Sequence, residues 1–402
     1  MSTSERIVLV APNAGEGMGG EAIKALQYFR HLLEAGTDVT LIAHARSRPR
    51  LGDLAASPRV IFVEDGPVQR LLWRSRALAG LLGVVFHLAA RRLIARRFDP
   101  ETCLIHYLCP ISPVEPRFPP RGFAFVLGPL NGAVGYPPAF HNAEGRRASV
   151  ERALAGLAQR LSALLLHEKG RARVVLVSGG ARTEASVRLA GARPERIRHV
   201  VDSGVSERFF TPRIRHEGVN GRFVAIGRFV AYKGFDMVIE AVARASAEVS
   251  LDVIGDGVDR VCLADLVRRL GLEDRVRFLG WVSNDEFAQR GREYRGFVFP
   301  TLAEANGIVM QEAMAVGLPV VTLRWGGPAT LADDAAAVFV EPTSRDAVIE
   351  ALAREMTVLA MDPDRAERLA AAARDIAEQR FRWPAVAGAW TSAIEASGDA
   401  EK

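Results

Sequence analysis

The sequence predicts an α/β protein with two doubly wound domains, and three observations carry this prediction. Short apolar runs alternate with helical stretches from residue 7 onward, a polar segment interrupts the pattern near residue 208, and a second alternating series follows. A parallel strand that is buried on both faces reads as a short continuous apolar run. Alternation of such strands with helices implies a parallel sheet covered by helices on both faces.

The first series begins with the apolar run IVLVAP (7–12), followed by a glycine-rich turn and a helical stretch that stops at Gly36. Further strands are expected at 38–44, 59–63, 103–108, 124–128 and 173–178, and helices at 68–97 and 144–168. Because ligands of such folds bind at the carboxyl ends of the strands, the loops that follow these runs are the candidate site.

The segment RFFTPRIRHEGVNGR (208–222) is polar and contains one proline and two glycines, which is typical of an interdomain linker. The second series then supplies strands RFVAIGR, LDVIGDG, VRFLGW, GFVFP, PVVTL and AVFVE, with helices between them and a helical tail. We therefore expect domains at 1–207 and 222–380, a linker at 208–221 and a C-terminal segment at 381–402.

Composition excludes several classes of protein. The 402 residues are 49% hydrophobic and 25% charged, as in a folded globular chain, which excludes extensive disorder. Cys103, Cys109 and Cys262 form no CxxC pair, so neither a disulfide scaffold nor structural zinc is expected. The N-terminus lacks the features of a signal peptide, which predicts a cytoplasmic protein.

Charge is unevenly distributed along the chain. Residues 1–205 contain 28 basic and 17 acidic residues, although the whole chain has a net charge of only +5. This asymmetry either reflects different partners for the two halves or compositional drift in an arginine-rich chain. No basic segment is interleaved with aromatic residues and no nucleic-acid-binding motif occurs, so no nucleic-acid partner is expected.

The strongest motif is TLAEANGIVMQEAMAVGLPVV (301–321), in which Glu304 and Glu312 are separated by seven residues. Asn306, Gly307 and Ile308 open the predicted helix. Helix N-termini bind anions because their first backbone amides are unpaired. Glu312, about one turn into the helix, suits a pair of ribose hydroxyls, and Glu304 lies nearer the reacting sugar. The alternative is an ordinary helix with one glutamate at its start and another on its exposed face.

Arg228 and Lys233 lie in IGRFVAYKGFD (226–236), just after a predicted strand and before a helix. Two cations in this position suit a diphosphate and would neutralise the charge that develops as a nucleoside diphosphate leaves. Lys233 is one of only four lysines in the chain. The alternative interpretation is a pair of solvated surface cations.

The first strand–helix turn, GEGMGGE (15–21), contains the spacing G-x-G-x-x-G. As a dinucleotide fingerprint it is poor, because three residues separate the strand from Gly15 and no acidic residue ends the second strand. We expect the backbone of Gly19 and Gly20 to face the diphosphate instead; an NADP site or a purely structural turn remains open.

These segments together resemble retaining glycosyltransferases of family GT4, which have the GT-B fold. The resemblance covers nearly the whole chain, and is most specific in GRFVAYKGFDMVIEAV and EANGIVMQEAMAVGLPVV. It implies two Rossmann-like domains facing across a cleft, with 381–402 crossing back to the N-terminal domain. It assigns Arg228 and Lys233 to the donor diphosphate, Glu304 to the donor sugar and Glu312 to the ribose. It also places the amides of the donor loop on the sugar–phosphate: Asn306, Gly307 and Ile308. Many members have a small residue followed by an aromatic where this chain has Ala305–Asn306.

His106 in CLIHYLCP resembles the active-site histidine of this family, which contacts the donor sugar; a packed strand-end histidine is the alternative. Asn131 and Gly132 in GPLNGAVGYP are expected on the acceptor side. The family's chemistry proceeds on one face of the sugar, with the leaving diphosphate helping to take the acceptor proton. The resemblance therefore implies no cofactor and no metal, and no aspartate pair suggests a metal site.

Residues 68–98 contain seven arginines and no acidic residue around an apolar stretch of 14 residues, which is too short to span a bilayer. Such a segment either lies on an anionic membrane or forms a core helix with arginines on its wet face. A membrane location would suit a lipid-linked acceptor.

The sequence thus predicts a hexosyltransferase. It would transfer the hexose of a UDP- or GDP-sugar to a hydroxyl of a glycan acceptor in surface polysaccharide assembly. The habit of the family and the basic segment 68–98 suggest that this acceptor is linked to a lipid. The protein would be cytoplasmic or peripheral on the inner face of the membrane. The alternatives are a nucleotide-sugar 2-epimerase of the same fold, an NADP-dependent oxidoreductase and a non-catalytic glycan- or nucleotide-binding protein.

Overall fold

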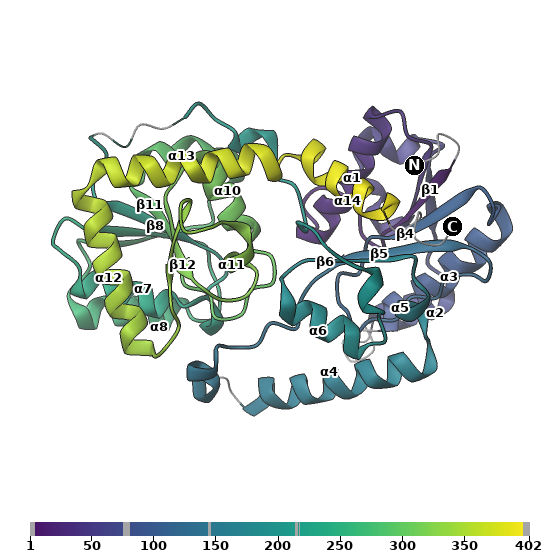
Figure 1. Cartoon of the computed structure of the whole chain (residues 1–402), viewed down its shortest axis with the longest axis horizontal. Helices are drawn as coiled ribbons and strands as arrows, with labels where there is room; N and C mark the ends of the chain where they lie inside the picture. Colours follow the sequence, from purple (N-terminus) through teal and green to yellow (C-terminus); the bar gives the residue numbers. More distant parts are fainter. Residues whose placement is uncertain (1–4, 75–80, 144–145, 214–215, 217, 397–402) are drawn as a thin grey trace. The chain divides into compact units, whose positions relative to one another are not determined.

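The computed structural model describes residues 5–74, 81–143, 146–213, 216 and 218–396. The chain divides into two compact units (Figure 1). Unit 1 comprises Met1–Ala133, Val150–Gly204 and Trp383–Lys402, and unit 2 comprises Val134–Ser149 and Val205–Arg382.

The core of unit 1 is a parallel sheet that has, in the described residues, seven strands in the order β3-β2-β1-β4-β5-β6-β7. Its strands are β1 Arg6–Val10, β2 Val39–His44, β3 Val60–Val63, β4 Cys103–Tyr107, β5 Ala124–Leu130, β6 Val174–Val177 and β7 Ile197–His199. Its helices are α1 Gly20–Glu34, α2 Pro67–Arg74, α3 Leu82–Arg97, most of α4 Arg146–Leu165, α5 Glu168–Arg171, α6 Ala181–Leu189 and α14 Trp383–Glu395.

Alternation along β1 shows why helices cover both faces of this sheet. Ile7 and Leu9 belong to the cluster that includes side chains of α1 and α14. Val8 and Val10 belong to the opposite cluster, which includes Phe86 of α3. Every second side chain of a strand points to the same face, so a continuous apolar run needs partners on both sides.

Unit 2 contains a second parallel sheet, with six strands among the described residues, in the order β10-β9-β8-β11-β12-β13. Its strands are β8 Arg222–Ile226, β9 Ser250–Ile254, β10 Val276–Gly280, β11 Gly296–Phe299, β12 Val320–Leu323 and β13 Ala337–Val340. Its helices are α7 Phe235–Arg244, α8 Arg260–Leu270, α9 Asn284–Arg290, α10 Ile308–Val316, α11 Pro328–Leu331, α12 Arg345–Met361 and α13 Pro363–Arg380.

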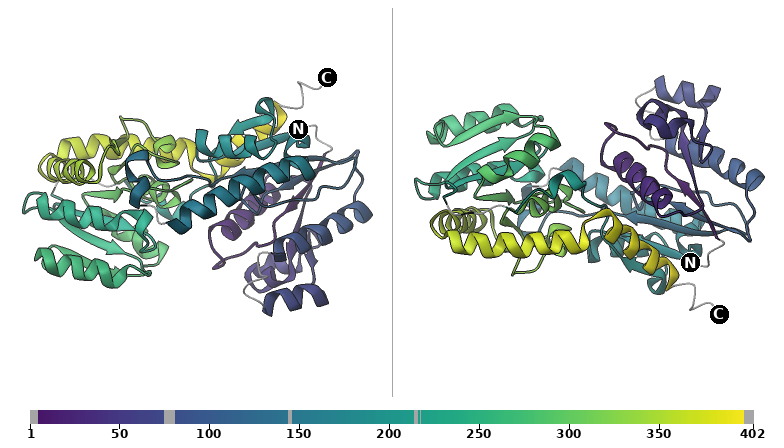
Figure 2. Two further views of the ribbon diagram at one scale, coloured as in Figure 1. Left: turned by 90° about the horizontal axis from the view of Figure 1, so that it is seen from below. Right: turned by 90° about the horizontal axis from the view of Figure 1, so that it is seen from above.

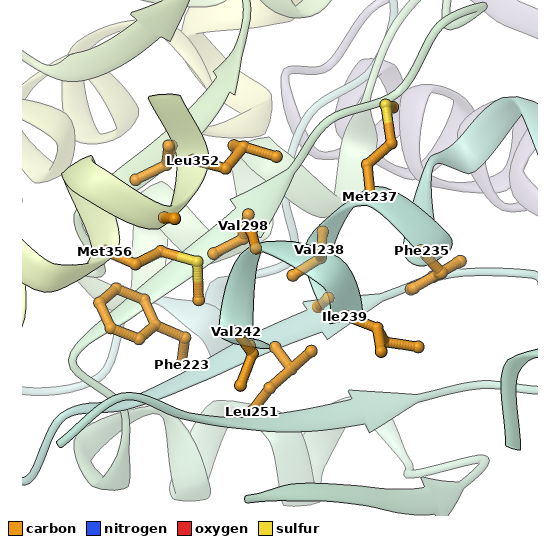
Figure 3. Close-up of a cluster of buried hydrophobic side chains, with 14 of the residues drawn as sticks. Phe223, Phe235, Met237, Val238, Ile239, Val242, Leu251, Val298, Leu352 and Met356 are labelled. Atoms are coloured by element: carbon orange, nitrogen blue, oxygen red, sulfur yellow. The ribbon is translucent and has the colours of Figure 1, made fainter. Parts of the chain in front are cut away.

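One face of the second sheet packs against α7, α8 and α12. Phe223 of β8 and Leu251 of β9 contact a layer that includes Val238, Val242 and Met356 (Figure 3). On the other face, α10 lies against β11 and β12 and is covered by α13. The prediction of two doubly wound parallel sheets is confirmed.

The units differ from the predicted domain boundaries mainly in two segments. Residues 134–149, expected in the N-terminal domain, group with unit 2, where Phe140 is buried in the core. Residues 208–221, expected to form a linker, also belong to unit 2. His216 is fully buried there and its ring bonds to the Gly317 carbonyl at 3.1 Å. Buried aromatic and imidazole groups, rather than polar composition, decide where these segments pack.

Candidate active site

The candidate site of unit 2 is built by two loops that follow neighbouring strands. β8 and β11 are hydrogen-bonded parallel neighbours, so the loops after Ile226 and Phe299 leave the same edge of the sheet. They are tied together by the Leu302 amide, which donates to the Tyr232 carbonyl at 2.7 Å. Sheet order therefore brings residues that are 70 positions apart in the sequence into one site.

Lys233 and Glu304 meet where these loops join. The Lys233 ammonium forms an ion pair with the Glu304 carboxylate, and only 14% and 21% of the two side chains are exposed. The Lys233 Nζ also lies 5.0 Å from the centre of the Phe299 ring, which is within the range of a cation–π contact. Both groups are thus shielded and held at fixed positions.

Gly234 allows this close approach of the two loops. Its φ is +71°, a conformation that favours glycine, and a Cβ atom there would lie 2.5 Å from the Pro300 carbonyl oxygen. Any larger residue would push the Lys233 loop away from the Glu304 loop.

The helix predicted to open at 306–308 begins at Ile308, after Gly307 with a φ of +80°. The first helical amides lie directly after the Glu304 loop, which gives a site for an anion at the helix N-terminus. The Asn306 Oδ1 atom is buried without a hydrogen-bond partner within the described part of the chain. An unsatisfied acceptor in this position suits a hydroxyl donor.

Glu312 lies on the second turn of α10 as a half-buried side chain. Burial raises the pKa of this carboxyl group to about 8, and the positive charge of Arg208 acts weakly in the opposite direction. The group is therefore largely protonated at neutral pH. Perturbed carboxyl groups of this kind are typical of functional sites.

Arg228 also follows β8, but its side chain is exposed. A cavity of about 380 Å³ lies beside this loop, between α7 and α8. It shares Val230, Ala231 and Leu302 with the site but is lined by neither Lys233 nor Glu304. We therefore define the candidate site by the positions of the Lys233 and Glu304 side chains rather than by this cavity.

A turn that the sequence analysis did not single out supports the Glu304 loop. The Gly327 amide donates to the Glu304 carbonyl at 2.8 Å, and a Cβ atom at Gly327 would lie 2.0 Å from the Ala305 carbonyl oxygen. The dipeptide Gly326–Gly327 before Pro328, just after a strand, is the signal that could have identified it. Trp281, just after β10, is 69% exposed at the same sheet edge.

In unit 1, the surroundings of His106 match the alternative of a packed strand-end histidine, and its role toward the donor sugar stays a prediction. Its side chain is 1% exposed, its Nε2 lies 2.6 Å from the Gly128 carbonyl oxygen, and its ring packs edge-on against Tyr28 and Trp390. Burial lowers the pKa of His106 to about 4, so the ring is neutral at pH 7. Because His106 shares its face of the strand with Leu104, it points into the core.

Asn131 and Gly132 line a cavity of about 600 Å³ in unit 1, together with residues of the 111–114 loop, α4 and α6. The fully buried Arg117 holds that loop by donating to the carbonyls of Pro110, Ser112 and Glu115. Gly19 and Gly20 are exposed at the start of α1, and Gly19 has a φ of +98°. The functional roles of these four residues stay predictions.

Neither a metal site nor a membrane span is found among the described residues. Among them, no group of three His, Cys, Asp or Glu side chains is placed to hold a metal ion. No helix in the same part of the chain has the length and apolar character needed to cross a bilayer. Residues 75–80 of the predicted membrane segment 68–98 lie outside the described residues.

The second half of the chain matches a known protein family. Residues 211–376 match the model of "Glycosyl transferases group 1". The D-inositol 3-phosphate glycosyltransferase of Xylanimonas cellulosilytica is 28% identical over 406 aligned positions, which cover 94% of this chain and 91% of that protein.

Residues 211–376 are thus those of a group 1 glycosyl transferase. Another relative, the lipopolysaccharide core biosynthesis glycosyltransferase LpsD of Rhizobium meliloti, is 33% identical over 168 residues. This match covers 42% of this chain and about half of LpsD, 47%. The match to LpsE of the same organism covers 30% of that protein.

Solved structures show the same fold. Sucrose-phosphate synthase from Thermosynechococcus elongatus matches with a TM-score of 0.69 and 21% identity, over 98% of this chain and 100% of that one. Anabaena HepE, solved in complex with UDP and glucose, matches with a TM-score of 0.64 and 17% identity over 98% and 100%. The prediction of the GT-B fold is therefore confirmed.

Proposed function

We propose that this chain is a retaining GT4 hexosyltransferase that moves a hexose from a nucleoside-diphosphate sugar to a hydroxyl of a lipid-linked glycan. The observation that carries the proposal is the meeting of Lys233, Glu304 and the start of α10, with Glu312 one turn further on. One loop–helix segment thus combines a cation and helix amides for phosphate with two carboxyl groups for hydroxyls.

In this proposal the diphosphate binds Lys233, Arg228 and the amides at Gly307 and Ile308. Glu312 accepts hydrogen bonds from the ribose, and Glu304 accepts them from the donor sugar. The orphaned Asn306 oxygen provides a further acceptor. Each group is matched to the charge or hydrogen-bonding capacity of the part of the donor assigned to it.

The chemical step breaks the bond between the sugar and the diphosphate oxygen while the acceptor hydroxyl attacks the same face of the sugar. The acceptor proton passes to the leaving diphosphate oxygen. Lys233, Arg228 and the helix N-terminus would stabilise the charge that develops on the diphosphate. The proposal assigns this stabilisation to fixed protein groups and requires neither a cofactor nor a metal.

The proposed class of acceptor is based on the names of similar proteins. LpsD and LpsE are named for lipopolysaccharide core biosynthesis, and a mycobacterial relative that is 31% identical over 175 residues is named a phosphatidylinositol monomannoside mannosyltransferase. We therefore propose a lipid-linked glycan acceptor, met at the inner face of the cytoplasmic membrane. The cavity beside Asn131 and Gly132 is the candidate acceptor pocket.

A thermal-shift screen tests the donor site. The purified chain would be heated with UDP, GDP, ADP, their hexose conjugates and NADP, each with and without EDTA. A ligand at one hundred times its dissociation constant stabilises by about 2.7 kcal/mol. We expect one nucleoside diphosphate to act selectively, without sensitivity to EDTA, and Glu312→Ala to abolish the response. A response to NADP alone would refute the proposal.

An acceptor assay then separates transfer from epimerisation. We expect the selected donor to release its nucleoside diphosphate faster when membrane lipid extract is added, with radiolabelled hexose recovered in the lipid phase. Conversion of the donor into its 2-epimer without acceptor would instead assign the chain to the epimerases of this fold.

A further inference from the structure

Helix α4 carries a row of leucines on its outer side. Leu154, Leu157, Leu161, Leu164 and Leu165 are 60%, 55%, 47%, 69% and 76% exposed. Their spacing of three, four, three and one residues keeps all five within an arc of about 100° on the helix surface. The row is about 16 Å long, at 1.5 Å per residue. We call it the α4 leucine row.

The opposite side of α4 is the one that packs on unit 1. The Gln159 side chain donates to the Ser186 hydroxyl of α6, and Gly156 and Gln159 line the 600 Å³ cavity. The Ala163 methyl group lies close to Gly191. The helix is thus anchored through small and polar residues. Figures 1 and 2 show it along the outside of unit 1, with no other helix or strand of the described residues of that unit over its outer side.

This orientation is the reverse of an ordinary surface helix, which turns its apolar face to the core. Monomeric proteins rarely expose contiguous apolar patches of this kind unless the patch is an interaction site. Burying five leucines against a core would be strongly favourable, yet the fold leaves them outside. The α4 leucine row therefore requires a partner that supplies an apolar environment.

The charge around the row indicates which partner fits. The exposed Arg160 lies beside Leu161 on α4 itself, and the exposed Arg182 of α6 lines the same cavity as Gly156 and Gln159 of α4. Residues 1–205 as a whole carry eleven more basic than acidic residues. Two copies of so basic a surface would repel each other, whereas an anionic lipid surface attracts it.

We propose that the α4 leucine row docks this chain on an anionic membrane surface, with the leucines inserted among the lipid chains and the surrounding arginines at the headgroups. Amphipathic helices bind bilayers in this way, parallel to the surface. The location differs from the membrane segment 68–98 that the sequence suggested. The inference rests on the proposed function in one respect only: membrane docking would bring the candidate active site to a lipid-linked acceptor.

Sedimentation with lipid vesicles tests the proposal. Wild-type chain would be mixed with vesicles of phosphatidylcholine alone or with 30 mol% phosphatidylglycerol, about a third of the lipid, as a typical anionic surface. The test variant is Leu157→Gln/Leu161→Gln/Leu164→Gln. The matched control, Val258→Gln/Val261→Gln, alters valines of unit 2 that are 85% and 69% exposed. Glutamine is a good helix former, so both variants are expected to fold.

We expect wild type and the control variant to bind the anionic vesicles at least tenfold more strongly than the neutral ones. The leucine variant should lose at least tenfold in affinity for anionic vesicles while its thermal shift with nucleoside diphosphate stays the same. Raising the salt concentration should weaken the binding of wild type.

Three results would overturn the proposal. They are absence of wild-type binding to either vesicle, wild-type affinity in the leucine variant, and a wild-type dimer that the leucine substitutions dissociate. The last would assign the row to a second copy. The donor response is read separately, so a chain that binds vesicles but no nucleoside diphosphate would refute the proposed function and leave this inference standing.

Discussion

Lys233 and Glu304 neutralise each other where the loops after β8 and β11 meet. The ammonium group lies between the Glu304 carboxylate and the Phe299 ring, so both charges already have partners before any ligand arrives. The sequence suggested separate roles for the two residues, one on phosphate and one on sugar. If both roles hold, donor binding must exchange one partner for another: the phosphate takes the ammonium group and releases the carboxylate to a sugar hydroxyl.

This exchange predicts opposite effects of two substitutions on the binding of a nucleoside diphosphate that lacks the sugar. Lys233→Met removes a charge-assisted contact worth about 1.5–3 kcal/mol, so affinity should fall about 10- to 150-fold. Glu304→Gln removes the competing carboxylate, so affinity should hold or rise several-fold, while turnover of the sugar donor falls. Calorimetry on both variants checks this; equal losses of affinity would contradict the exchange.

The raised pKa of Glu312 predicts a pH dependence of donor binding. With a pKa of about 8 the carboxyl group is protonated at pH 7 in the free chain. If the ionised form binds the ribose, binding releases a proton below pH 8, and affinity rises by up to tenfold per pH unit from pH 6 to 8. Calorimetry of a nucleotide sugar in buffers of different ionisation enthalpy measures that proton. Glu312→Gln should bind weakly, without proton release.

The same group affects stability with the opposite sign. The folded-state pKa lies above the unfolded value, so wild type loses stability as pH rises from about 4.5 to 8. Glu312→Gln should therefore match wild type near pH 4.5 and melt at a higher temperature at pH 8.5. A constant difference between the two melting curves across this range would show that Glu312 is not desolvated.

Gly307 and Gly317 offer a matched pair at the two ends of α10. Both have left-handed backbones, with φ of +80° and +94°. Alanine at either position should cost about 1–2 kcal/mol of stability. Only Gly307→Ala places a methyl group beside the helix N-terminus, 3.4 Å from Pro328, so it alone should also weaken diphosphate binding. Similar losses of affinity in both variants would argue against an anion at this terminus.

His106 is predicted to act through packing. Its folded-state pKa of about 4 lies below the unfolded value of 6.5, so its neutral form contributes stability above pH 6.5 that is lost as pH falls toward 4, roughly 3 kcal/mol. His106→Gln should remove this pH dependence and lower stability at pH 7, because the Gly128 carbonyl loses its partner. Nucleoside-diphosphate affinity should be unchanged; a tenfold loss with unchanged melting would restore a role in binding.

Local patterns were sufficient to predict most strands and helices, because each is an apolar run or a helical period bounded by glycine or proline. They also indicated candidate site residues: Lys233 and Glu304 in the loops after two strands, and Glu312 in the helix that follows. They did not predict that Lys233 pairs with Glu304, because that contact depends on β8 and β11 being neighbours in the sheet. Strand order is set by the packing of the whole unit, and no sequence pattern near Lys233 or Glu304 encodes it.

His106 and Phe140 show two further limits of the sequence. His106 shares one face of the strand CLIHYL with Leu104 and Leu108, so the strand period alone favoured burial of its side chain, whereas the family resemblance suggested a site residue. Phe140 lies in a proline-rich stretch without helical or strand period, yet its ring is buried in the core of unit 2. Only the assembled core determines where such an isolated aromatic side chain packs.

Trp390 of α14 is fully buried in unit 1, where its indole N–H donates to the Val201 carbonyl at 2.8 Å and its ring contacts Tyr28. Tyr28, which is synthesised early, thus depends for its packing on Trp390, which is synthesised near the end of the chain. While the ribosome is still synthesising the chain, the surface of Tyr28 and His106 that α14 covers stays open to water. Unit 2, whose segments end at Arg382, is the first that can finish folding, so nascent unit 1 must be kept from aggregating until α14 emerges.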